Sequence, residues 1–152
     1  DEYQDEVEII YPVHKNPLVR EIAQRHLANK SNVYLIEPLD YQPFAQLMHR
    51  SHLVLTDSGG MQEEAPALGK PVLVLRAVTE RPEAVAAGTA KLIGNQRETV
   101  YAGIKELLDE ETVYAAMAHA ANPYGDGMAS QRIVAALQCF WQGSVPKDWL
   151  LK

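Results

Sequence analysis

The fold of this protein is decided by the stretch LVLTDSGGMQEE, residues 53–64, which joins an apolar run to a helix-forming segment through two glycines. The run at 53–56 is rich in branched side chains and lacks polar alternation, as is typical of a strand buried on both faces of a parallel sheet. A strand that leads through a short turn into a helix is the βα unit of an α/β fold. The stretch therefore predicts the fold class and, at the carboxyl end of its strand, the place where a ligand binds.

Four further apolar runs flank this stretch, and the starts of neighbouring runs lie about 18 to 26 residues apart, the spacing of repeated βα units. They occupy residues 7–11, 33–36, 72–75 and 90–93. The runs at 33–36 and 72–75 also lack polar alternation, as expected of strands buried on both faces. The order reads βαβαβαβαβ followed by a helical cluster, which predicts a single doubly wound α/β domain with a parallel sheet over residues 1–152.

The segments between the runs have the periodicity and the end signals of helices. Asn16 caps the first helix, with Pro17 at its first position. Its apolar stripe consists of Leu18, Val19, Ile22, Ala23 and Leu27. Further helices are expected after Asp40, from Gly60 to Gly69, over 100–108 and 113–121, and from Met128 to about Phe140. Residues 76–83 are interpreted as a charged loop.

The composition is that of a globular protein, because 47% of the 152 residues are hydrophobic and 22% are charged. No apolar run approaches the ~18 residues that a membrane helix needs, so a membrane partner is not expected. The formal net charge of -6 argues against a general nucleic-acid surface, since phosphate backbones require a basic face. Any phosphate must therefore be bound locally, by backbone N–H groups and one or two arginines.

The cysteine content and the first residues bear on where the protein acts. Cys139 is the single cysteine, which excludes an intramolecular disulfide and Cys-rich zinc sites, and we interpret it as a small core residue. The acidic first residues lack the layout of a signal peptide, which indicates a cytoplasmic protein. The sequence has no initiator Met and enters an apolar strand within about six residues, so we expect a piece of a longer chain.

The glycine pair Gly59-Gly60 is the first candidate for a binding site. Glycines between a buried strand and a helix let a ligand approach the backbone closely, and the free N–H groups of the first helical turn favour a phosphate or diphosphate. Ser58 can add a hydroxyl donor. Glu64 lies one turn beyond Gly60 on the same helix face, where its carboxylate can accept hydrogen bonds from a ribose. A tight βα turn without any ligand is an open alternative.

Charged residues near the pair have their own interpretations. We interpret Glu63 as first-turn charge favoured by the helix dipole, and Asp57 as a cap of the same helix rather than a catalytic group. Arg81 follows the fourth strand and would face the same edge as Ser58, where its planar guanidinium can meet a phosphate. His14 lies in the loop after the first strand. No two histidines share a metal-ligand spacing with carboxylates, so we expect no metal and no cofactor.

Four motifs occur in the loops of this sequence. They are Tyr-Pro-Val-His-x-Asn-Pro at 11–17, Thr-Asp-Ser-Gly-Gly-x-Gln-Glu-Glu-Ala-Pro at 56–66, Thr-Glu-Arg-Pro-Glu at 79–83 and Asn-Pro-Tyr-Gly-Asp-Gly at 122–127. Together they resemble the motifs of the non-hydrolysing UDP-N-acetylglucosamine 2-epimerases, whose two Rossmann-like halves form the architecture called GT-B with the active site in the cleft between them. The resemblance implies that this chain is most of the C-terminal half, without the N-terminal half that carries the main catalytic carboxylates.

The resemblance also implies a reaction and a role for the glycine turn. Enzymes of this family eliminate UDP reversibly from UDP-N-acetylglucosamine and add it back with inverted configuration at C2, which gives UDP-N-acetylmannosamine. Ser58, Gly59 and Gly60 would hold the diphosphate and Glu64 the ribose hydroxyls, so this half would stabilise the departing diphosphate. No catalytic residue is expected in this chain, because proton abstraction at C2 belongs to the missing half.

Other parts of the chain receive roles from the same resemblance. Phe44 would receive the uracil, Arg81 would complete the anion site, and His14 would lie near the cleft. In this fold class the last helix crosses toward the other half, which predicts an exposed apolar face at Phe140 and Trp141. The expected partners are UDP-N-acetylglucosamine or UDP, the missing N-terminal half of the same polypeptide, and a second copy of the full-length protein in a homodimer.

Other functions stay open at this point. A glycosyltransferase half of the same architecture would keep the diphosphate and ribose sites but transfer the sugar to an acceptor. A hydrolysing epimerase would release free N-acetylmannosamine and UDP. A non-catalytic module that binds nucleotide sugars, and an α/β domain without any ligand, are the alternatives from a different class.

Overall fold

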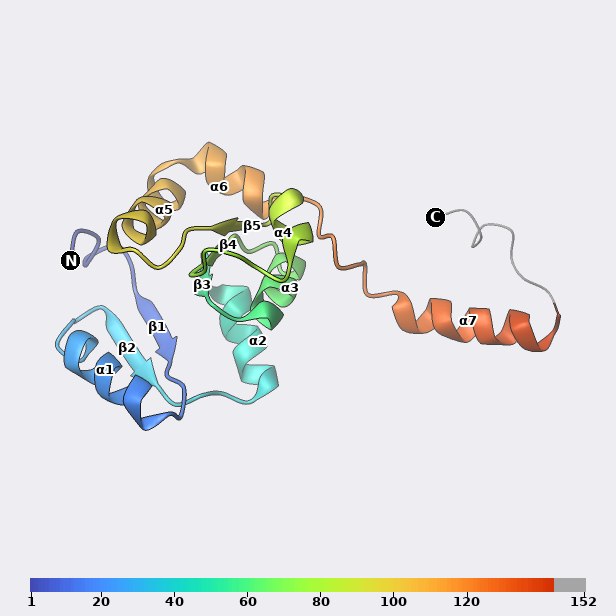
Figure 1. Cartoon of the computed structure of the whole chain (residues 1–152), viewed down its shortest axis with the longest axis horizontal. Coiled ribbons are helices and arrows are strands. Elements are labelled where there is room, and N and C mark those ends of the chain that lie inside the picture. Colours follow the sequence, from blue (N-terminus) through green and yellow to red (C-terminus); the bar gives the residue numbers. More distant parts are fainter. Residues whose placement is uncertain (144–152) are drawn as a thin grey trace. The chain divides into compact units, whose positions relative to one another are not determined.

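The structure, a computed structural model, describes residues 1–143 and divides into two compact units, the first formed by residues 1–47 and the second beginning at residue 48. Each unit contains strands that pair in parallel, together with helices (Figure 1). The predicted α/β class with parallel strands is therefore confirmed. Among the described residues, no helix is both long enough and apolar enough to span a membrane.

The first unit is built on one βαβ repeat. Its elements are β1 (Ile9–Pro12), α1 (Pro17–Leu27) and β2 (Val33–Ile36). β1 pairs with β2 in parallel, so that the repeat closes through α1. The predicted start of α1 is confirmed, because the Asn16 side chain accepts a hydrogen bond from the Leu18 N–H at 3.0 Å and Pro17 is the first helical residue.

The second unit contains the three-stranded sheet. In chain order its elements are β3 (Val54–Thr56), α3 (Gly59–Ala67), β4 (Val72–Val74), α4 (Pro82–Ala86), β5 (Ala90–Leu92), α5 (Arg97–Asp109), α6 (Glu111–Ala118) and α7 (Ala129–Trp141). Helix α2 (Tyr41–Arg50) contains the boundary between the units. The strands lie in the order β3-β4-β5. Helix α4 begins inside the stretch 76–83 that we interpreted as a loop, since Pro82 supplies the fixed φ of a first helical residue.

The expected burial of three strands on both faces is correct only for β4. All three residues of β4 are buried, because this strand has a neighbour on either side. β2 and β3 each lie at an edge of their sheet, and they leave 46% of Tyr34 and 41% of Leu55 exposed. The stripe of α1 is likewise buried only in part: Ala23 is buried, whereas Leu18 and Ile22 are exposed.

The core of the second unit lies between its sheet and α5. Leu73, Ile93 and Leu107 form a buried cluster. The partly buried residues packed against it are Leu53, Leu75, Val100, Ile104, Val113 and Met117. Gly103 makes this packing possible, because a Cβ at that position would lie 2.7 Å from Ile93 Cγ2. The loops that follow β3 and β4 therefore start from a well-packed base.

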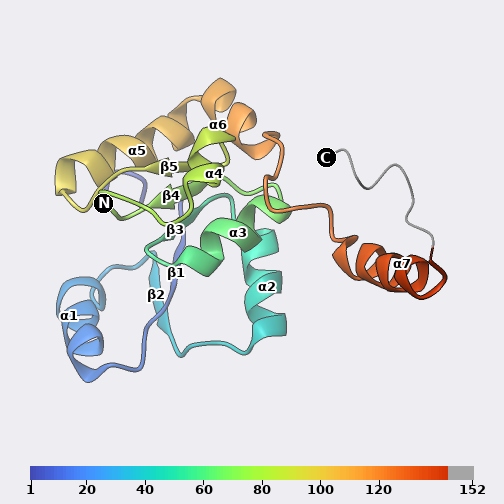
Figure 2. The same cartoon turned by 45° about the vertical axis from the view of Figure 1, so that its right-hand side comes forward.

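The predicted helical cluster at the end of the chain holds for α5 and α6, which pack against each other (Figure 2). Helix α7 contains no buried residue, and Cys139, which we interpreted as a core residue, is half-buried there. The predicted exposure of Phe140 and Trp141 is confirmed, at 78% and 83%. Ile133, Val134 and Leu137 of the same helix are exposed as well.

Candidate functional site

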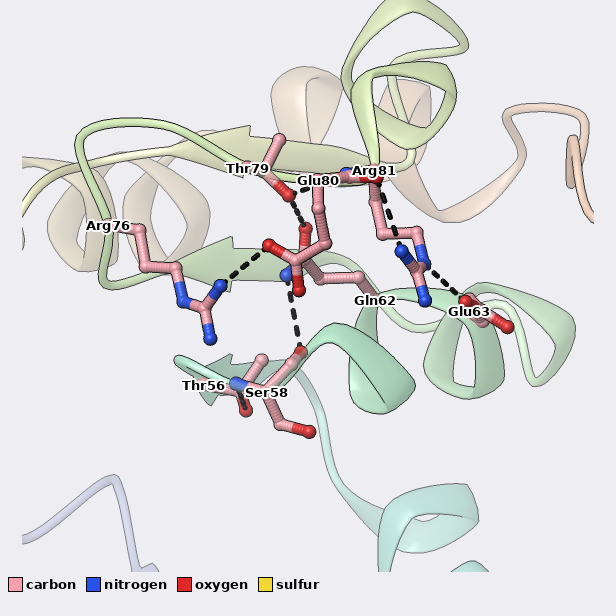
Figure 3. Close-up of polar contacts among 8 residues, drawn as sticks. All are labelled: Thr56, Ser58, Gln62, Glu63, Arg76, Thr79, Glu80 and Arg81. Carbon is pink, nitrogen blue, oxygen red and sulfur yellow. Dashed lines mark hydrogen bonds and ion pairs between the residues drawn. The ribbon is translucent and has the colours of Figure 1, made fainter.

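The candidate site lies in the second unit, where the loops after β3 and β4 meet. β3 pairs with β4 in parallel, with Thr56 opposite Val74, so both strands end at the same edge of the sheet. The loop after β3 leads through Ser58 into α3, and the loop after β4 brings Thr79 and Arg81 toward the same helix (Figure 3). This is the edge at which parallel α/β sheets bind their ligands.

Gly59 and Gly60 are not required by the backbone conformation, because neither has a positive φ. Space explains them better. A Cβ at Gly60 would meet nothing closer than Ser58 Oγ at 3.8 Å and Glu64 Oε1 at 4.0 Å. A Cβ at Gly59 would lie 2.5 Å from Glu80 Oε1, at the end of a flexible side chain. Gly60 therefore leaves the backbone at the start of α3 open to close approach by a ligand, whereas the end of the Glu80 side chain lies next to Gly59.

Ser58 is the N-cap residue of α3, with extended backbone angles, but its side chain makes no capping hydrogen bond. Its own N–H donates to Thr56 Oγ1 at 3.0 Å, and its hydroxyl points away from Gln62 in Figure 3. The hydroxyl and the first N–H groups of the helix are thus left for another partner. Our interpretation of Asp57 as the cap is wrong, because Asp57 precedes the N-cap residue.

Arg81 lies beside the same helix terminus, and its guanidinium is held in place. Its Nε donates to Glu63 Oε1 and its Nη1 donates to the backbone carbonyl of Glu80 at 3.2 Å. The hydrogen bond from Arg81 to Glu63, with the charge of that carboxylate, raises the pKa of Arg81 above its usual value. A Cβ at Gly59 would lie 3.9 Å from Arg81 Cζ, so this permanent positive charge is next to the glycine pair.

The acidic residues around the pair differ in their partners. Glu63 pairs with Arg81, so our interpretation of Glu63 as first-turn charge is wrong; no acidic residue lies in the first turn of α3. Glu80 pairs with Arg76 at 2.6 Å. Among residues 1–143, Glu64 has neither a hydrogen bond nor an ion pair, which leaves its carboxylate for a ligand. In the same part of the chain, no group of three or more His, Cys, Asp and Glu side chains could hold a metal ion.

Gln62 and Thr79 join the two loops, and neither was predicted to be a site residue. Thr79 Oγ1 donates to Gln62 Oε1 at 2.6 Å, and Gln62 Nε2 donates to the Ser58 carbonyl at 3.2 Å. A signal for Gln62 was present, because Gln62, Ala65 and Pro66 have the i, i+3, i+4 spacing of one helix face and all three are buried. Thr79 is the first residue of the motif at 79–83, but nothing in that motif indicates a bond to Gln62.

The turn at 122–127 contributes Tyr124 to the surroundings of this site. The Asn122 side chain accepts a hydrogen bond from the Tyr124 N–H at 3.1 Å, which fixes the turn. The Tyr124 hydroxyl is buried. Burial raises the pKa of Tyr124, and the charges of Glu83, Glu63 and Arg81 act on the same group. The turn therefore lies close to the pair formed by Glu63 and Arg81.

His14 and Phe44 belong to the first unit and are described there alone. His14 is exposed in the loop after β1, and its Nδ1 accepts a hydrogen bond from the Asn16 N–H at 3.1 Å. Phe44 is half-buried in α2, whose backbone N–H at this residue donates to the Asp40 carbonyl. Leu39, near Phe44 in the chain, lines an apolar hollow of about 410 Å³. The roles predicted for His14 and Phe44 stay predictions.

Comparisons with known proteins agree in their result. Residues 1–138 match the family described as UDP-N-acetylglucosamine 2-epimerase. The UDP-N-acetylglucosamine 2-epimerase of Bacillus subtilis (strain 168) is 55% identical over 136 residues, which are 90% of this chain and 36% of that protein. The chain thus spans about a third of the length of the curated relatives it matches.

Solved structures extend the agreement to the fold. An S. aureus protein solved with UDP is 52% identical, with a TM-score of 0.85, and the match covers 91% of this chain and 38% of that one. The UDP-GlcNAc 2-epimerase of Neisseria meningitidis, solved with UDP-GlcNAc, is also 52% identical, with a TM-score of 0.80 over 86% of this chain and 36% of the other. The predicted fold class, the Rossmann-like C-terminal half of a GT-B-type enzyme, is confirmed by these likenesses. This chain belongs to the UDP-N-acetylglucosamine 2-epimerase family.

Proposed function

We propose that this chain is the UDP-binding part of an enzyme that interconverts UDP-N-acetylglucosamine and UDP-N-acetylmannosamine by eliminating UDP and adding it back. Family membership supports the proposal, as do the related structures that were solved with UDP and with UDP-GlcNAc. The observation that carries it is the open backbone at Gly60, next to a serine hydroxyl that makes no capping hydrogen bond and to the Arg81 guanidinium beside Gly59.

In this proposal, the start of α3 stabilises the leaving group. When the bond between C1 of the sugar and the diphosphate oxygen breaks, its electron pair moves onto that oxygen and the negative charge of the diphosphate increases. The N–H groups at Gly59 and Gly60, the Ser58 hydroxyl and the Arg81 guanidinium meet this charge, and Arg81 is already fixed by Glu63. The base that removes the proton at C2 belongs to the part of the enzyme outside this chain.

The remaining site residues take up the nucleoside. Glu64 accepts hydrogen bonds from the ribose hydroxyls, a role consistent with a carboxylate close to Gly60 that has no partner within residues 1–143. Phe44 receives the uracil and His14 lies near the cleft. In this proposal residues 1–152 form one Rossmann-like domain for UDP, and the catalytic half precedes it in the complete polypeptide.

The proposal separates the complete protein from this chain. The chain spans about a third of its relatives, so by itself it binds UDP but does not epimerise the sugar nucleotide. The complete protein acts in the cytoplasm as a homodimer. Light scattering of the complete protein at micromolar concentration tests the dimer directly, because a monomeric mass contradicts it.

The decisive experiment uses the complete polypeptide and UDP-N-acetylglucosamine alone, followed by proton NMR. Accumulation of UDP-N-acetylmannosamine without any acceptor is the expected result. Release of free N-acetylmannosamine and UDP would identify a hydrolysing enzyme instead. If the sugar nucleotide stays unchanged by itself and is consumed only after an acceptor is added, the enzyme is a glycosyltransferase.

A further inference from the structure

Gln62 is a fully buried polar side chain at the candidate site, and the proposed function leaves it without a role. None of its surface is exposed. A carboxamide taken out of water costs free energy unless its donor and its acceptor are both paired. Both are paired, because Nε2 donates to the Ser58 carbonyl at 3.2 Å and Oε1 accepts from the Thr79 hydroxyl at 2.6 Å.

The direction of these hydrogen bonds is fixed by the chemistry of the partners. A carbonyl oxygen only accepts, so the amide nitrogen of Gln62 must face Ser58 and its oxygen must face Thr79. Thr79 Oγ1 donates to Gln62 and accepts from the Arg81 N–H at 3.0 Å. One continuous line of hydrogen bonds therefore runs from the backbone of Arg81 to the N-cap carbonyl of α3 (Figure 3).

The next residue of the helix completes the arrangement. Glu63 points about 100° away from Gln62 around the helix axis and holds the guanidinium of Arg81. Two successive residues of α3 thus fix the same arginine. Gln62 holds the Arg81 backbone through Thr79, and Glu63 holds the Arg81 side chain. Within residues 1–143, the loop after β4 makes no other side-chain hydrogen bond or ion pair to α3, so these two residues set where Arg81 lies relative to Ser58.

We propose that Gln62 is a positioning residue for the diphosphate, because its carboxamide sets the spacing between the N-terminus of α3 and Arg81. The inference rests on the proposed function, in which both of these groups contact the diphosphate. Gln62 itself touches no ligand atom in this arrangement, since its two polar atoms are used by Ser58 and Thr79. Its effect should therefore fall on the phosphates and not on the nucleoside.

The test measures the affinity of each folded variant for UDP and for uridine at low temperature. Gln62→Met keeps the length of the side chain without its hydrogen bonds, and Thr79→Val removes the hydroxyl at nearly constant shape. Each should weaken UDP binding about tenfold, as the loss of a buried hydrogen bond does, and leave uridine binding unchanged. Thr79→Ser keeps the hydroxyl and should bind UDP like the unsubstituted chain.

Two controls separate positioning from general damage. Leu107→Ala, in the core, should lower the melting temperature without changing the ratio of UDP to uridine affinity. The double variant Gln62→Met/Thr79→Val should lose less UDP affinity than the sum of the two single losses, because both changes break the bond between Gln62 and Thr79. If Gln62→Met does not fold, Thr79→Val and Thr79→Ser carry the test by themselves.

The outcomes distinguish this inference from the proposed function. UDP affinity that is unaffected in Gln62→Met and Thr79→Val, or an equal loss for UDP and uridine, would overturn the positioning role and leave the epimerase proposal standing. An unsubstituted chain that does not bind UDP, together with a complete polypeptide that forms no epimer, would overturn both. A selective loss for UDP that Thr79→Ser does not share supports both.

Discussion

Gly60 and Gly103 are helical glycines of the same unit, and they differ in what fills the space of the missing side chain. At Gly103 in α5, a Cβ would lie 2.7 Å from Cγ2 of the buried Ile93, so the protein itself occupies that space. At Gly60 in α3, the nearest atoms to a Cβ would be 3.8 Å and 4.0 Å away, an ordinary contact distance. The first glycine serves packing, whereas the second leaves room that no part of the described chain uses.

The side chains around the two glycines also differ, being apolar at Gly103 and polar at Gly60. Gly103 faces the apolar cluster of Leu73, Ile93 and Leu107. Gly60 faces Ser58 and Glu64, two polar side chains that donate or accept no hydrogen bond through their side chains within residues 1–143. A glycine that costs helix stability and has free polar groups beside it is best explained by a ligand.

The largest effect is expected on the packing side of the contrast. Leu107 is 1% exposed in the core that Gly103 allows to close, and Leu107→Ala should lower the free energy of unfolding by about 2–5 kcal/mol. Urea denaturation of the chain measures this change. UDP affinity, determined by calorimetry where the variant is still folded, should not change. A large loss of UDP affinity would mean that the core and the candidate site are not independent.

Gly103→Ala tests the glycine itself. The new methyl group must displace Ile93, whose neighbours leave it little room, so we expect a loss of about 1–3 kcal/mol in the free energy of unfolding. The gain in helix propensity, at most about 1 kcal/mol, opposes this loss without cancelling it. Denaturation of Gly103→Ala beside the unsubstituted chain checks the sign. A variant of equal or greater stability would show that Ile93 yields easily.

Gly60→Ala is the matched substitution on the other side. The free chain has room for the methyl group, and alanine favours the helix, so stability should stay unchanged or rise by up to about 1 kcal/mol. UDP affinity should fall about tenfold or more, because the methyl group occupies the space in which the diphosphate approaches the backbone. Calorimetry with UDP measures this loss. Undiminished UDP affinity would remove the ligand explanation for Gly60.

The sequence was sufficient for most of the elements and for their order, because strand runs and caps are local signals. The cap at Asn16 and the helix end before Gly69, which has a φ of +67°, were both predictable from residue type. Burial was less predictable, since it depends on neighbours that a run of residues does not reveal. Leu55 and Leu73 lie in similar apolar runs of the sequence. Leu55 is nevertheless 41% exposed in an edge strand, whereas Leu73 is fully buried in the central strand.

The candidate site was likewise predictable where its residues are neighbours in sequence, and not where they are distant. Ser58, the glycine pair and Glu64 are close in sequence, so one turn of helix geometry was enough to group them. The pairing of Glu63 with Arg81 joins residues 18 positions apart and depends on the register of β3 against β4. That register and the short helix α4 were not readable from local patterns. Gln62 was overlooked for another reason: a polar residue on the inward face of a helix is unusual, and its partner Thr79 lies in the other loop.

The smallest expected effect concerns Glu64, and it asks whether the open space at Gly60 continues along the helix. Glu64→Gln keeps the shape of the side chain and one acceptor but removes the charge, so UDP affinity should fall about threefold to tenfold, as the loss of a charge-assisted hydrogen bond does. Calorimetry with 2′-deoxy-UDP provides the control, because the unsubstituted chain should discriminate against it and Glu64→Gln should discriminate less.

Comparing UDP with 2′-deoxy-UDP shows which part of the nucleotide Glu64 contacts, as well as how strong that contact is. If Glu64 accepts from the ribose hydroxyls, removing either the carboxylate charge or the 2′-hydroxyl weakens the same interaction, and the two losses are not additive. Additive losses would place Glu64 elsewhere on the nucleotide. Glu63→Gln is the matched neighbour: it faces Arg81 instead of Gly60, so it should weaken UDP binding through the phosphates while the preference for UDP over 2′-deoxy-UDP stays as it is in the unsubstituted chain.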